Sequence, residues 1–464
     1  MIRLSFDRGT ILVHSDGDPP PDLPGCVHDP RVGAWRAPAM AYREIVLALR
    51  AHLRRADSEP AADAAALVDE ARDYRPLELR SRLERTPFPY QEEAVEAWNA
   101  AGRRGVIVLP TGSGKTFVAQ LAMERVGRPT LVVAPTIDLM QQWYGVLGTS
   151  FDVEVGLVGG GYHEPKPLTV TTYDSAYIHM ERLGNRFGLI VFDECHHLPG
   201  PTYQTAAECS IAPFRLGLTA TPEREDGREG LLDALIGPIV YRQGIKELAG
   251  EYLADYETVT LRVAMADAER ERYRAAREKY LDFVRAWQIP ISSPGGWARF
   301  LMLTSRSEDG RSAFLAYREQ KTIAQASEAK LRLLEKLLAR HRGDRVLIFT
   351  NDNATVYRIS RQFLVPAITH QTKVKERHET LARFNAGVYP FLVTSKVLNE
   401  GVDVPAASVA VVLSGSGSVR EHVQRLGRIL RRGEGKHATL YEVIAEDTAE
   451  ESVSTRRRRH SAYS

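Results

Sequence analysis

The sequence is poor in cysteine and has almost no excess of charge. Its 464 residues include three cysteines, Cys26, Cys195 and Cys209, and no two of them have CxxC spacing. We therefore expect neither a disulfide framework nor a structural zinc site, and a reducing compartment is the simplest interpretation. The 61 Lys and Arg residues against 59 Asp and Glu residues leave a formal net charge of +2. Any surface that binds a polyanion must therefore be local.

Long apolar runs are also missing. No run approaches the roughly 20 apolar residues that a membrane-spanning helix needs. The first residues, MIRLSFDRGT, contain an acid and lack the apolar core of a secretory signal. We therefore expect a cytoplasmic protein that does not enter a membrane. The length alone predicts about three domains.

The sequence does contain a regular alternation of apolar runs and helical patterns. The apolar runs fall into two groups, at 105–109, 130–134, 168–172, 189–193 and 214–219, and at 345–350, 365–369, 391–395 and 409–413. This alternation predicts two α/β domains in tandem, each with a parallel sheet that is covered by helices.

The remaining segments differ in character. Residues 1–85 combine short strand-like pieces, a Pro-rich stretch and two expected helices, at 40–55 and 61–73, and predict a small α+β domain. A stretch rich in Ala, Arg, Glu and Tyr predicts an all-helical insertion near the start of the second α/β domain. The expected domains are therefore 1–85, 86–245, 246–455 with the insertion at about 265–335, and a basic tail at 456–464.

The segment PTGSGKT, at 110–116, directly follows the first apolar run. Its glycines let backbone N–H groups approach phosphate oxygens, Lys115 is expected to neutralise the β- and γ-phosphates, and Thr116 to bind Mg²⁺. The predicted nucleotide-binding residues of this loop are Thr111, Gly112, Ser113, Gly114, Lys115 and Thr116.

A second polar segment, DECHH, starts at the end of the apolar run 189–193. Asp193 is expected to hold Mg²⁺, and Glu194 to act as the general base on the attacking water. Zinc would need two ligands besides His196 and His197, so we expect one of these histidines to link the nucleotide site to the neighbouring domain instead. Together with the phosphate loop, this segment predicts a nucleoside triphosphatase that uses ATP and Mg²⁺.

Two further polar segments have more than one interpretation. Thr219 and Thr221 either cap a helix that starts at Pro222 or form a hydrogen-bonded coupling element. In QRLGRILRR, Arg428 and Arg431 are three residues apart and are expected to share one helix face, either as a solvated basic helix or to stabilise charge on the transferred phosphoryl group. With Gln424, they are the candidate catalytic residues of the second domain. Their site would be complete only when the two domains close.

Seven segments in order resemble the motifs of superfamily 2 helicases, over about residues 85–464. They are PTGSGKT, APTIDLMQQW, TTYDSA, DECHH, LTATP, TSKVLNEGVDVP and QRLGRILRR. The resemblance implies two RecA-like domains with ATP in their cleft and nucleic acid across their top. It further implies that Gln91 reads the adenine and that Gly401 and Asp403 approach the nucleotide. DNA phosphates would be held mostly through backbone N–H and hydroxyl groups, here those of Thr136, Thr171, Thr172 and Thr394.

A narrower resemblance is to xeroderma pigmentosum B-type (XPB) helicases. Arg224, Glu225 and Asp226 resemble the RED motif, a candidate DNA-engaging element, and the helical insertion resembles that family's thumb. The segments FDRGT and DPRVGAWRA resemble its N-terminal damage-recognition domain. The resemblance implies an ATP-dependent 3′–5′ DNA helicase in excision repair or transcription, with a partner nuclease. We expect a monomer.

Two other functions stay open. One is a double-stranded DNA translocase, or an RNA-directed ATPase, that does not separate strands. The other is a DNA-damage-binding scaffold with a vestigial ATPase. The presence of Lys115, Asp193, Glu194 and Arg428 argues against the scaffold.

Overall fold

The computed structural model describes residues 1–15, 23–56, 67–82, 84–224, 226–291, 293, 295–398, 404, 406–415, 418–431 and 436–457. The chain divides into two compact units, Met1–Gly244 and Ile245–Ser464. Within the described ranges, every helix is too short or too polar to cross a bilayer.

The first unit begins with a small five-stranded sheet in the order β3-β4-β2-β1-β5. The loop between β1 and β2 is two residues long, and Arg8 and Gly9 both have positive φ, which gives the tight turn of a right-twisted hairpin. Helix α1, preceded by a 3₁₀ turn (η1, Ala39–Ala41), packs on this sheet through Ile45 and Leu49. The elements are β1 Ile2–Asp7, β2 Thr10–Ser15, β3 Val27–Asp29, β4 Ala34–Pro38, β5 Leu67–Asp69 and α1 Tyr42–Ala56.

The helix that we expected at 61–73 is wrong over its described part. Leu67–Asp69 form strand β5, which pairs in parallel with β1. The strand is fixed by its neighbours, because the Tyr42 hydroxyl donates to Asp69 at 2.6 Å and Arg72 pairs with the same carboxylate at 2.8 Å. Tertiary pairing here overrides a composition rich in helix-forming residues. Residues 61–66 lie outside the described part.

The rest of the first unit is an eight-stranded sheet in the order β13-β6-β12-β11-β7-β10-β8-β9. All pairings are parallel except that of β9 with β8. The strands are β6 Arg104–Val108, β7 Thr130–Ala134, β8 Val155–Gly159, β9 Tyr162–Glu164, β10 Leu168–Thr172, β11 Leu189–Asp193, β12 Phe214–Thr219 and β13 Ile239–Arg242. The helical segments are α2 Pro89–Ala100, α3 Lys115–Val126, α4 Ile137–Ser150, α5 Tyr173–Leu183, η2 Cys195–His197, α6 Thr205–Glu208 and α7 Leu231–Leu235. The central strands are buried along their length, which is why they read as continuous apolar runs.

The second unit contains a six-stranded, all-parallel sheet in the order β14-β19-β18-β15-β17-β16. Its strands are β14 Asp255–Val263, β15 Val346–Phe349, β16 Ala367–Ile368, β17 Phe391–Thr394, β18 Val409–Val412 and β19 His437–Ala445. Its helical segments other than the insertion are α8 Ile245–Leu248, α12 Glu328–Arg340, α13 Asn353–Phe363, α14 Val374–Asn385, η3 Lys396–Leu398, α15 Val419–Ile429 and α16 Ala449–Arg457.

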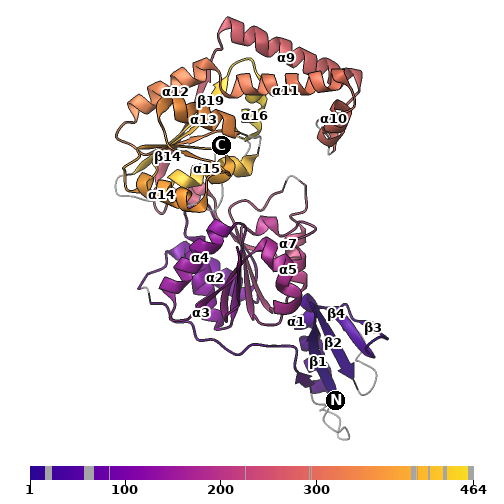
Figure 1. The fold of residues 1–464 in the computed structure, drawn as a ribbon. Helices are drawn as coiled ribbons and strands as arrows, with labels where there is room; N and C mark the ends of the chain where they lie inside the picture. The colour runs from indigo at the N-terminus through magenta and orange to yellow at the C-terminus, as the bar shows by residue number, and fades with distance from the viewer. Residues whose placement is uncertain are drawn as a thin grey trace. The chain divides into compact units, whose positions relative to one another are not determined.

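Three helices inserted between β14 and α12 form the thumb, Asp267–Gln325. They are α9 Asp267–Ala286, α10 Gly296–Thr304 and α11 Glu308–Gln325, and Figure 1 shows α9 and α11 side by side with α10 at one end. The thumb has its own core, which includes Phe283 and Phe300. Helix α12 instead packs its leucines into the core of the sheet, so the insertion ends about ten residues before the expected limit of 335.

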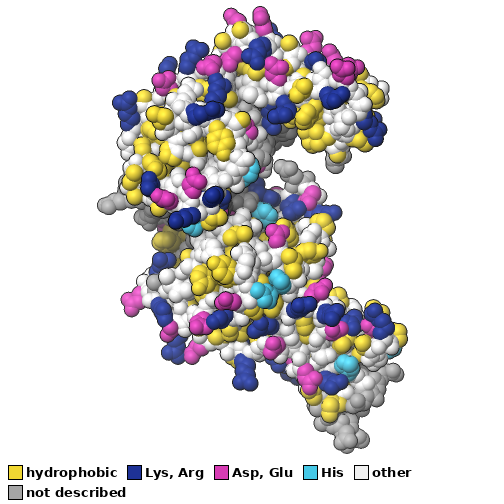
Figure 2. Space-filling model, viewed as in Figure 1, with side chains coloured by type: hydrophobic (Ala, Val, Ile, Leu, Met, Phe, Trp, Pro, Cys, Tyr) yellow, Lys and Arg dark blue, Asp and Glu magenta, His cyan; other side chains and the backbone are white. Residues whose placement is uncertain are grey.

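The predicted fold class is confirmed. The chain has two α/β domains in tandem, each built on a mostly parallel sheet, with a small α+β domain before them and a helical insertion in the second α/β domain. On the face shown in Figure 2, basic and acidic side chains are interspersed.

Candidate active site

The phosphate loop connects β6 to α3 by a tight turn. Gly112 has a φ of 90°, and Gly114, the N-cap of α3, has a φ of 83°. A Cβ at position 114 would lie 2.6 Å from the Gln91 Nε2 atom, so a side chain cannot be placed there without moving Gln91. Both glycines therefore permit a close turn that leads directly into the N-terminus of α3, where backbone N–H groups can receive an anion.

The polar side chains of the loop fit a phosphate chain. The Lys115 Nζ atom lies 3.3 Å from the carbonyl oxygens of Leu109 and Pro110, folded across the loop. The Thr111 hydroxyl is enclosed and has no hydrogen-bond partner among the described residues. Thr116 lies in the first turn of α3. A polyphosphate with its metal ion would pair with the Lys115 cation and give the Thr111 hydroxyl a hydrogen-bond partner.

Gln91 holds the phosphate loop from the neighbouring helix α2. Its Oε1 atom accepts the Phe88 backbone N–H at 3.0 Å, and its Nε2 atom donates to the Ser113 carbonyl at 3.0 Å. The Tyr90 hydroxyl donates to the same carbonyl at 2.5 Å, and Gln91 is only 4% exposed. The Gln91 Oε1 atom can accept one further hydrogen bond, so an adenine edge would share the amide with these internal contacts. The Ser113 hydroxyl is also used internally, because it donates to the Pro110 carbonyl at 2.8 Å.

Asp193, at the end of β11, is buried and oriented by a tryptophan. Its Oδ2 atom accepts the indole N–H of Trp143 at 2.7 Å, and its Oδ1 atom accepts the Glu194 backbone N–H at 3.0 Å. Burial, and next the charge of Glu194, raise the pKa of Asp193 to about 6. A divalent cation would favour the ionised carboxylate, so the donor set fits Mg²⁺.

Trp143 is a further candidate residue of the site, and its contact with Asp193 is not evident from its place in the sequence. It lies on α4, inside the segment APTIDLMQQW, and is 2% exposed. A buried indole N–H needs an acceptor, but nothing in the local spacing shows that the acceptor is fifty residues away.

Glu194 occupies a strained backbone position beside a hydrogen-bonded cluster. Its φ of 45° is in the left-handed region, which costs a residue with a side chain about 1 kcal/mol or more. Its Oε2 atom lies 3.4 Å from the Thr219 hydroxyl and 3.4 Å from Nδ1 of His196. The buried His196 also contacts the Thr219 hydroxyl, at 3.0 Å through Nδ1. The ends of β11 and β12 are thus joined through these three side chains.

The other two predicted coupling residues lie close by. The Thr221 backbone N–H donates to the Thr219 hydroxyl at 3.2 Å. The ring of His197 lies 4.3 Å from that of His196 and 5.9 Å from that of Tyr173. Across the described ranges, no group of three or more His, Cys, Asp or Glu side chains is arranged to hold a metal ion by itself.

Arg224 is bound inside the first unit. Its guanidinium contacts both carboxylate oxygens of Asp226, at 2.7 and 2.6 Å, and it donates to the carbonyl oxygen of His196. Its side chain is 17% exposed. The RED segment is therefore attached to the DECHH segment through Arg224, a connection that the sequence did not indicate. Glu225 lies outside the described residues, as do Gly401 and Asp403.

The four threonines that we expected on DNA act within the fold. Thr136 and Thr172 are the N-caps of α4 and α5, where their hydroxyls accept the N–H groups of Leu139 and Ser175, both at 3.2 Å. The hydroxyls of Thr171 and Thr394 are buried and donate to strand carbonyls at 2.7 and 3.0 Å. In this conformation, the hydroxyls of Thr171 and Thr394 therefore cannot reach DNA, whereas DNA contacts through backbone groups at these positions stay a prediction.

The basic segment near the C-terminus departs from its expected geometry. Gln424 is buried and Arg428 half-buried on α15, but the helix ends at Ile429. Arg431 lies beyond it and forms a β-bridge with Leu253, so the predicted common helix face for Arg428 and Arg431 is wrong. Burial and the charge of Arg431 lower the pKa of Lys436 to about 8.

Arg425 is the buried cation of this segment. It is 1% exposed, its guanidinium lies 5.3 Å from the centre of the Phe349 ring, and it reaches the Ser414 carbonyl at 3.4 Å and Glu421 at 3.5 Å. Three of its neighbours come from separate elements, so Arg425 has a structural role that its sequence neighbours did not reveal.

Three segments match known families. Residues 84–224 match the family described as "Type III restriction enzyme, res subunit", and residues 329–433 match "Helicase conserved C-terminal domain". Residues 4–57 match "Xeroderma pigmentosum group B helicase damage recognition domain".

Two curated relatives cover most of the chain. It is 42% identical over 410 residues to the "DNA 3'-5' translocase XPB2" of Sulfurisphaera tokodaii, which covers 85% of this chain and 93% of the relative. It is 35% identical over 386 residues to the "DNA 3'-5' helicase XPB" of Kineococcus radiotolerans, over 80% of this chain and 62% of that longer relative. The solved Hef helicase domain of Pyrococcus furiosus is 19% identical, with a TM-score of 0.54 over 80% of this chain and 98% of that one, and supports the fold.

Proposed function

This chain belongs to the XPB family of DNA helicases and translocases, and we propose from that membership that it hydrolyses ATP to move along DNA in the 3′-to-5′ direction. The observation that carries the proposal is the match to 93% of the length of an archaeal relative that is named a DNA 3′-5′ translocase. Both relatives are named as enzymes that act on DNA, so a DNA strand is the expected substrate.

The nucleotide site of the first unit supports the ATPase part of this proposal. The N–H groups at the start of α3 and the Lys115 ammonium would bind the β- and γ-phosphates, and the Thr111 hydroxyl, which has no partner among the described residues, would gain one. Thr116 and Asp193 would hold Mg²⁺, which supplies positive charge for the phosphoryl group in transfer.

Glu194 is proposed as the general base. Its contacts with Thr219 and His196 hold the carboxylate at the ends of β11 and β12, where it could accept a proton from a water molecule. Arg224 donates to the carbonyl of His196, and His196 contacts Glu194. A shift of the RED segment would therefore move the groups that position the Glu194 carboxylate. This connection could couple DNA binding at the RED segment to ATP hydrolysis at Glu194.

The arginines of the second unit complete the proposed mechanism. Arg428 lies on α15 and is the candidate for stabilising charge on the transferred phosphoryl group, with Arg431 and Gln424 beside it in sequence. Their action requires the two units to close on ATP and to reopen after hydrolysis. This cycle is how hydrolysis would produce movement along a strand.

On DNA, we propose that phosphates are held mainly by main-chain groups. The N-termini of α4 and α5, capped by Thr136 and Thr172, present backbone N–H groups that position a strand without reading its sequence. A role in excision repair or in transcription, a partner nuclease and a monomeric state belong to the proposal as well.

The test is the response of ATP hydrolysis to single-stranded DNA, duplex DNA and RNA, together with unwinding of 3′-tailed and 5′-tailed duplexes. We expect stimulation by DNA and activity on the 3′-tailed substrate. Stimulation by RNA alone would refute the proposal. Hydrolysis in the wild type no faster than in Glu194→Gln would instead favour a DNA-binding scaffold.

A second candidate output is translocation on duplex DNA without strand separation. It is favoured by the name of the archaeal relative, a translocase and not a helicase. Displacement of a third strand from a triplex without unwinding of a tailed duplex would identify this output.

A further inference from the structure

The second unit contains a cavity of about 570 Å³ where the thumb meets the sheet. Helices α9 and α11 form one wall, and α16 contributes Ala449, Glu450 and Val453 to the other. Asn351 and Gly415 line it from the loops that follow β15 and β18. These loops lie at the carboxyl ends of parallel strands, the edge at which α/β sheets generally bind ligands.

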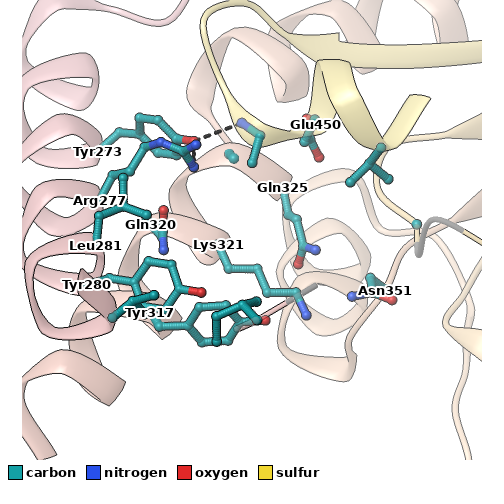
Figure 3. Close-up of a pocket in the computed structure, with 16 residues that line it drawn as sticks. Tyr273, Arg277, Tyr280, Leu281, Tyr317, Gln320, Lys321, Gln325, Asn351 and Glu450 are labelled. Carbon is teal, nitrogen blue, oxygen red and sulfur yellow. Dashed lines mark hydrogen bonds between the residues drawn. The ribbon is translucent and has the colours of Figure 1, made fainter. Parts of the chain in front are cut away.

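Three amide side chains line this cavity, those of Gln320, Gln325 and Asn351. Gln320 and Gln325 are 5% and 7% exposed, and neither side chain makes a hydrogen bond to any residue that the structure describes. The Oδ1 atom of Asn351 is enclosed and has no partner within the same set. Figure 3 shows these side chains around the same space. Because buried polar groups are normally hydrogen-bonded, the enclosed Asn351 oxygen needs a donor from the contents of the cavity, and the two glutamine amides can add donors and acceptors beside it.

An aromatic and apolar wall completes the lining. The rings of Tyr280 and Tyr317 lie 5.2 Å apart at 52°, next to the aliphatic side chains of Leu281 and Val284. Such a surface suits a flat, mostly apolar group that has hydrogen-bonding edges, and amides complement those edges. A nucleobase has this combination.

Positive charge lies at the same site. The Lys321 ammonium is 6.0 Å from the centre of the Tyr317 ring, and the Arg277 guanidinium is 3.4 Å from the Tyr273 hydroxyl. The acid in the lining, Glu450, is already paired with the Lys330 ammonium at 2.6 Å. The cavity therefore combines base-binding groups with two cations that can receive a phosphate.

We propose that this cavity binds one nucleotide unit, with its base against the tyrosine rings and the three amides, and its phosphate toward Lys321 and Arg277. The proposal rests on the proposed function for its source, a base unstacked from the DNA strand. A free mononucleotide has the same chemistry, and the test separates the two sources.

The test replaces both glutamines by leucine, Gln320→Leu with Gln325→Leu. Neither glutamine side chain is hydrogen-bonded to a residue that the structure describes, so the melting temperature should stay within about 2 °C of the wild type. Affinity is measured for an oligothymidylate strand and for an abasic strand of the same length. We expect about a ten-fold loss on the base-containing strand, as two lost hydrogen bonds imply, and less than about a two-fold loss on the abasic one.

The matched control is Gln362→Leu, the same change at an exposed position on α13. It should change neither affinity. If the double variant is unstable, the single Gln320→Leu variant is measured instead. Equal losses on the two strands would overturn the proposal, and so would no loss on either strand combined with no effect of thymidine monophosphate in the second arm.

A second arm tests the free nucleotide. Thymidine monophosphate that raises the melting temperature of the wild type but not of the double variant would identify a free nucleotide as the occupant. The two hypotheses fail separately. DNA-stimulated hydrolysis, with strand affinities unchanged in the double variant and no effect of thymidine monophosphate on the wild type, would reject the cavity proposal alone. Wild-type hydrolysis that DNA does not stimulate would reject the proposed function.

Discussion

The indole N–H of Trp143 donates to the carboxylate of Asp193 across 2.7 Å, from a helix fifty residues earlier in the chain. It binds one oxygen of this buried carboxylate, and the other oxygen accepts a hydrogen bond from the backbone N–H of Glu194. The proposed metal ligand is thus oriented from two sides before any ion is bound.

Replacing Trp143 by Phe should weaken the response to Mg²⁺. Groups that orient a metal ligand typically contribute ten-fold or more to metal affinity or activity, so we expect half-maximal ATP hydrolysis to need about ten-fold more Mg²⁺. The control is Trp98→Phe, because Trp98 is equally buried and its indole donates to the Arg215 carbonyl at 2.9 Å, away from the nucleotide loop. If the two variants have the same Mg²⁺ dependence, Trp143 is a packing residue only.

The same pair of residues predicts a pH dependence. The pKa of Asp193 is raised to about 6, and the hydrogen bond from Trp143 works against that rise. Activity that needs the ionised carboxylate should therefore fall as the pH decreases through about 6. In Trp143→Phe the pKa rises further, so the acidic limb of the rate profile should move upward by about one pH unit at low Mg²⁺. A limb that moves downward would contradict this sign.

Glu194→Gln should separate nucleotide binding from turnover. The amide keeps the size of the side chain but cannot accept the proton of the attacking water, and we expect hydrolysis to fall by about 10²-fold or more. The affinity for a fluorescent ATP analogue should stay within about three-fold, whereas Lys115→Ala should lower it strongly. Turnover near the wild-type rate in Glu194→Gln would assign the base to another residue.

Arg425 and Arg428 are neighbours in sequence with different expected roles. Arg428→Ala should lower turnover by about 10³-fold with ATP affinity nearly unchanged, if its guanidinium acts on the transferred phosphoryl group. Arg425→Ala should mainly lower the melting temperature, because it removes a buried cation and leaves the Ser414 carbonyl and Glu421 without its contacts. A loss of ten-fold or less in Arg428→Ala would make it a structural residue too.

Arg224→Lys tests the link between the RED and DECHH segments. Lysine keeps the charge but cannot bind Asp226 through two nitrogens and reach the His196 carbonyl as well. We expect stimulation of hydrolysis by DNA to fall several-fold while DNA affinity changes by less than about two-fold. Arg242→Lys is the control, since Arg242 pairs with Glu223 at 3.2 Å on the surface of the same unit. A proportional loss of DNA affinity would make Arg224 a DNA contact instead.

The sequence predicted the parts of the site that are local in the chain. A glycine-rich turn between a buried strand and a helix, and acids at the end of a later strand, can be identified from spacing because neighbouring residues define them. The role of Trp143 and the burial of Arg425 could not, because each depends on residues from distant elements. Arg431 was misplaced for a related reason: its bridge to Leu253 ends the helix early, and no residue between 428 and 431 signals that end.

The left-handed backbone at Glu194 has a consequence for how this protein could be improved. Glycine is the residue that adopts such a φ without cost, so Glu194→Gly would relieve local strain while deleting the side chain proposed to activate water. Selection for thermal stability alone would therefore favour glycine at position 194 and yield variants that do not hydrolyse ATP. Durable variants should be selected for survival and ATP turnover together.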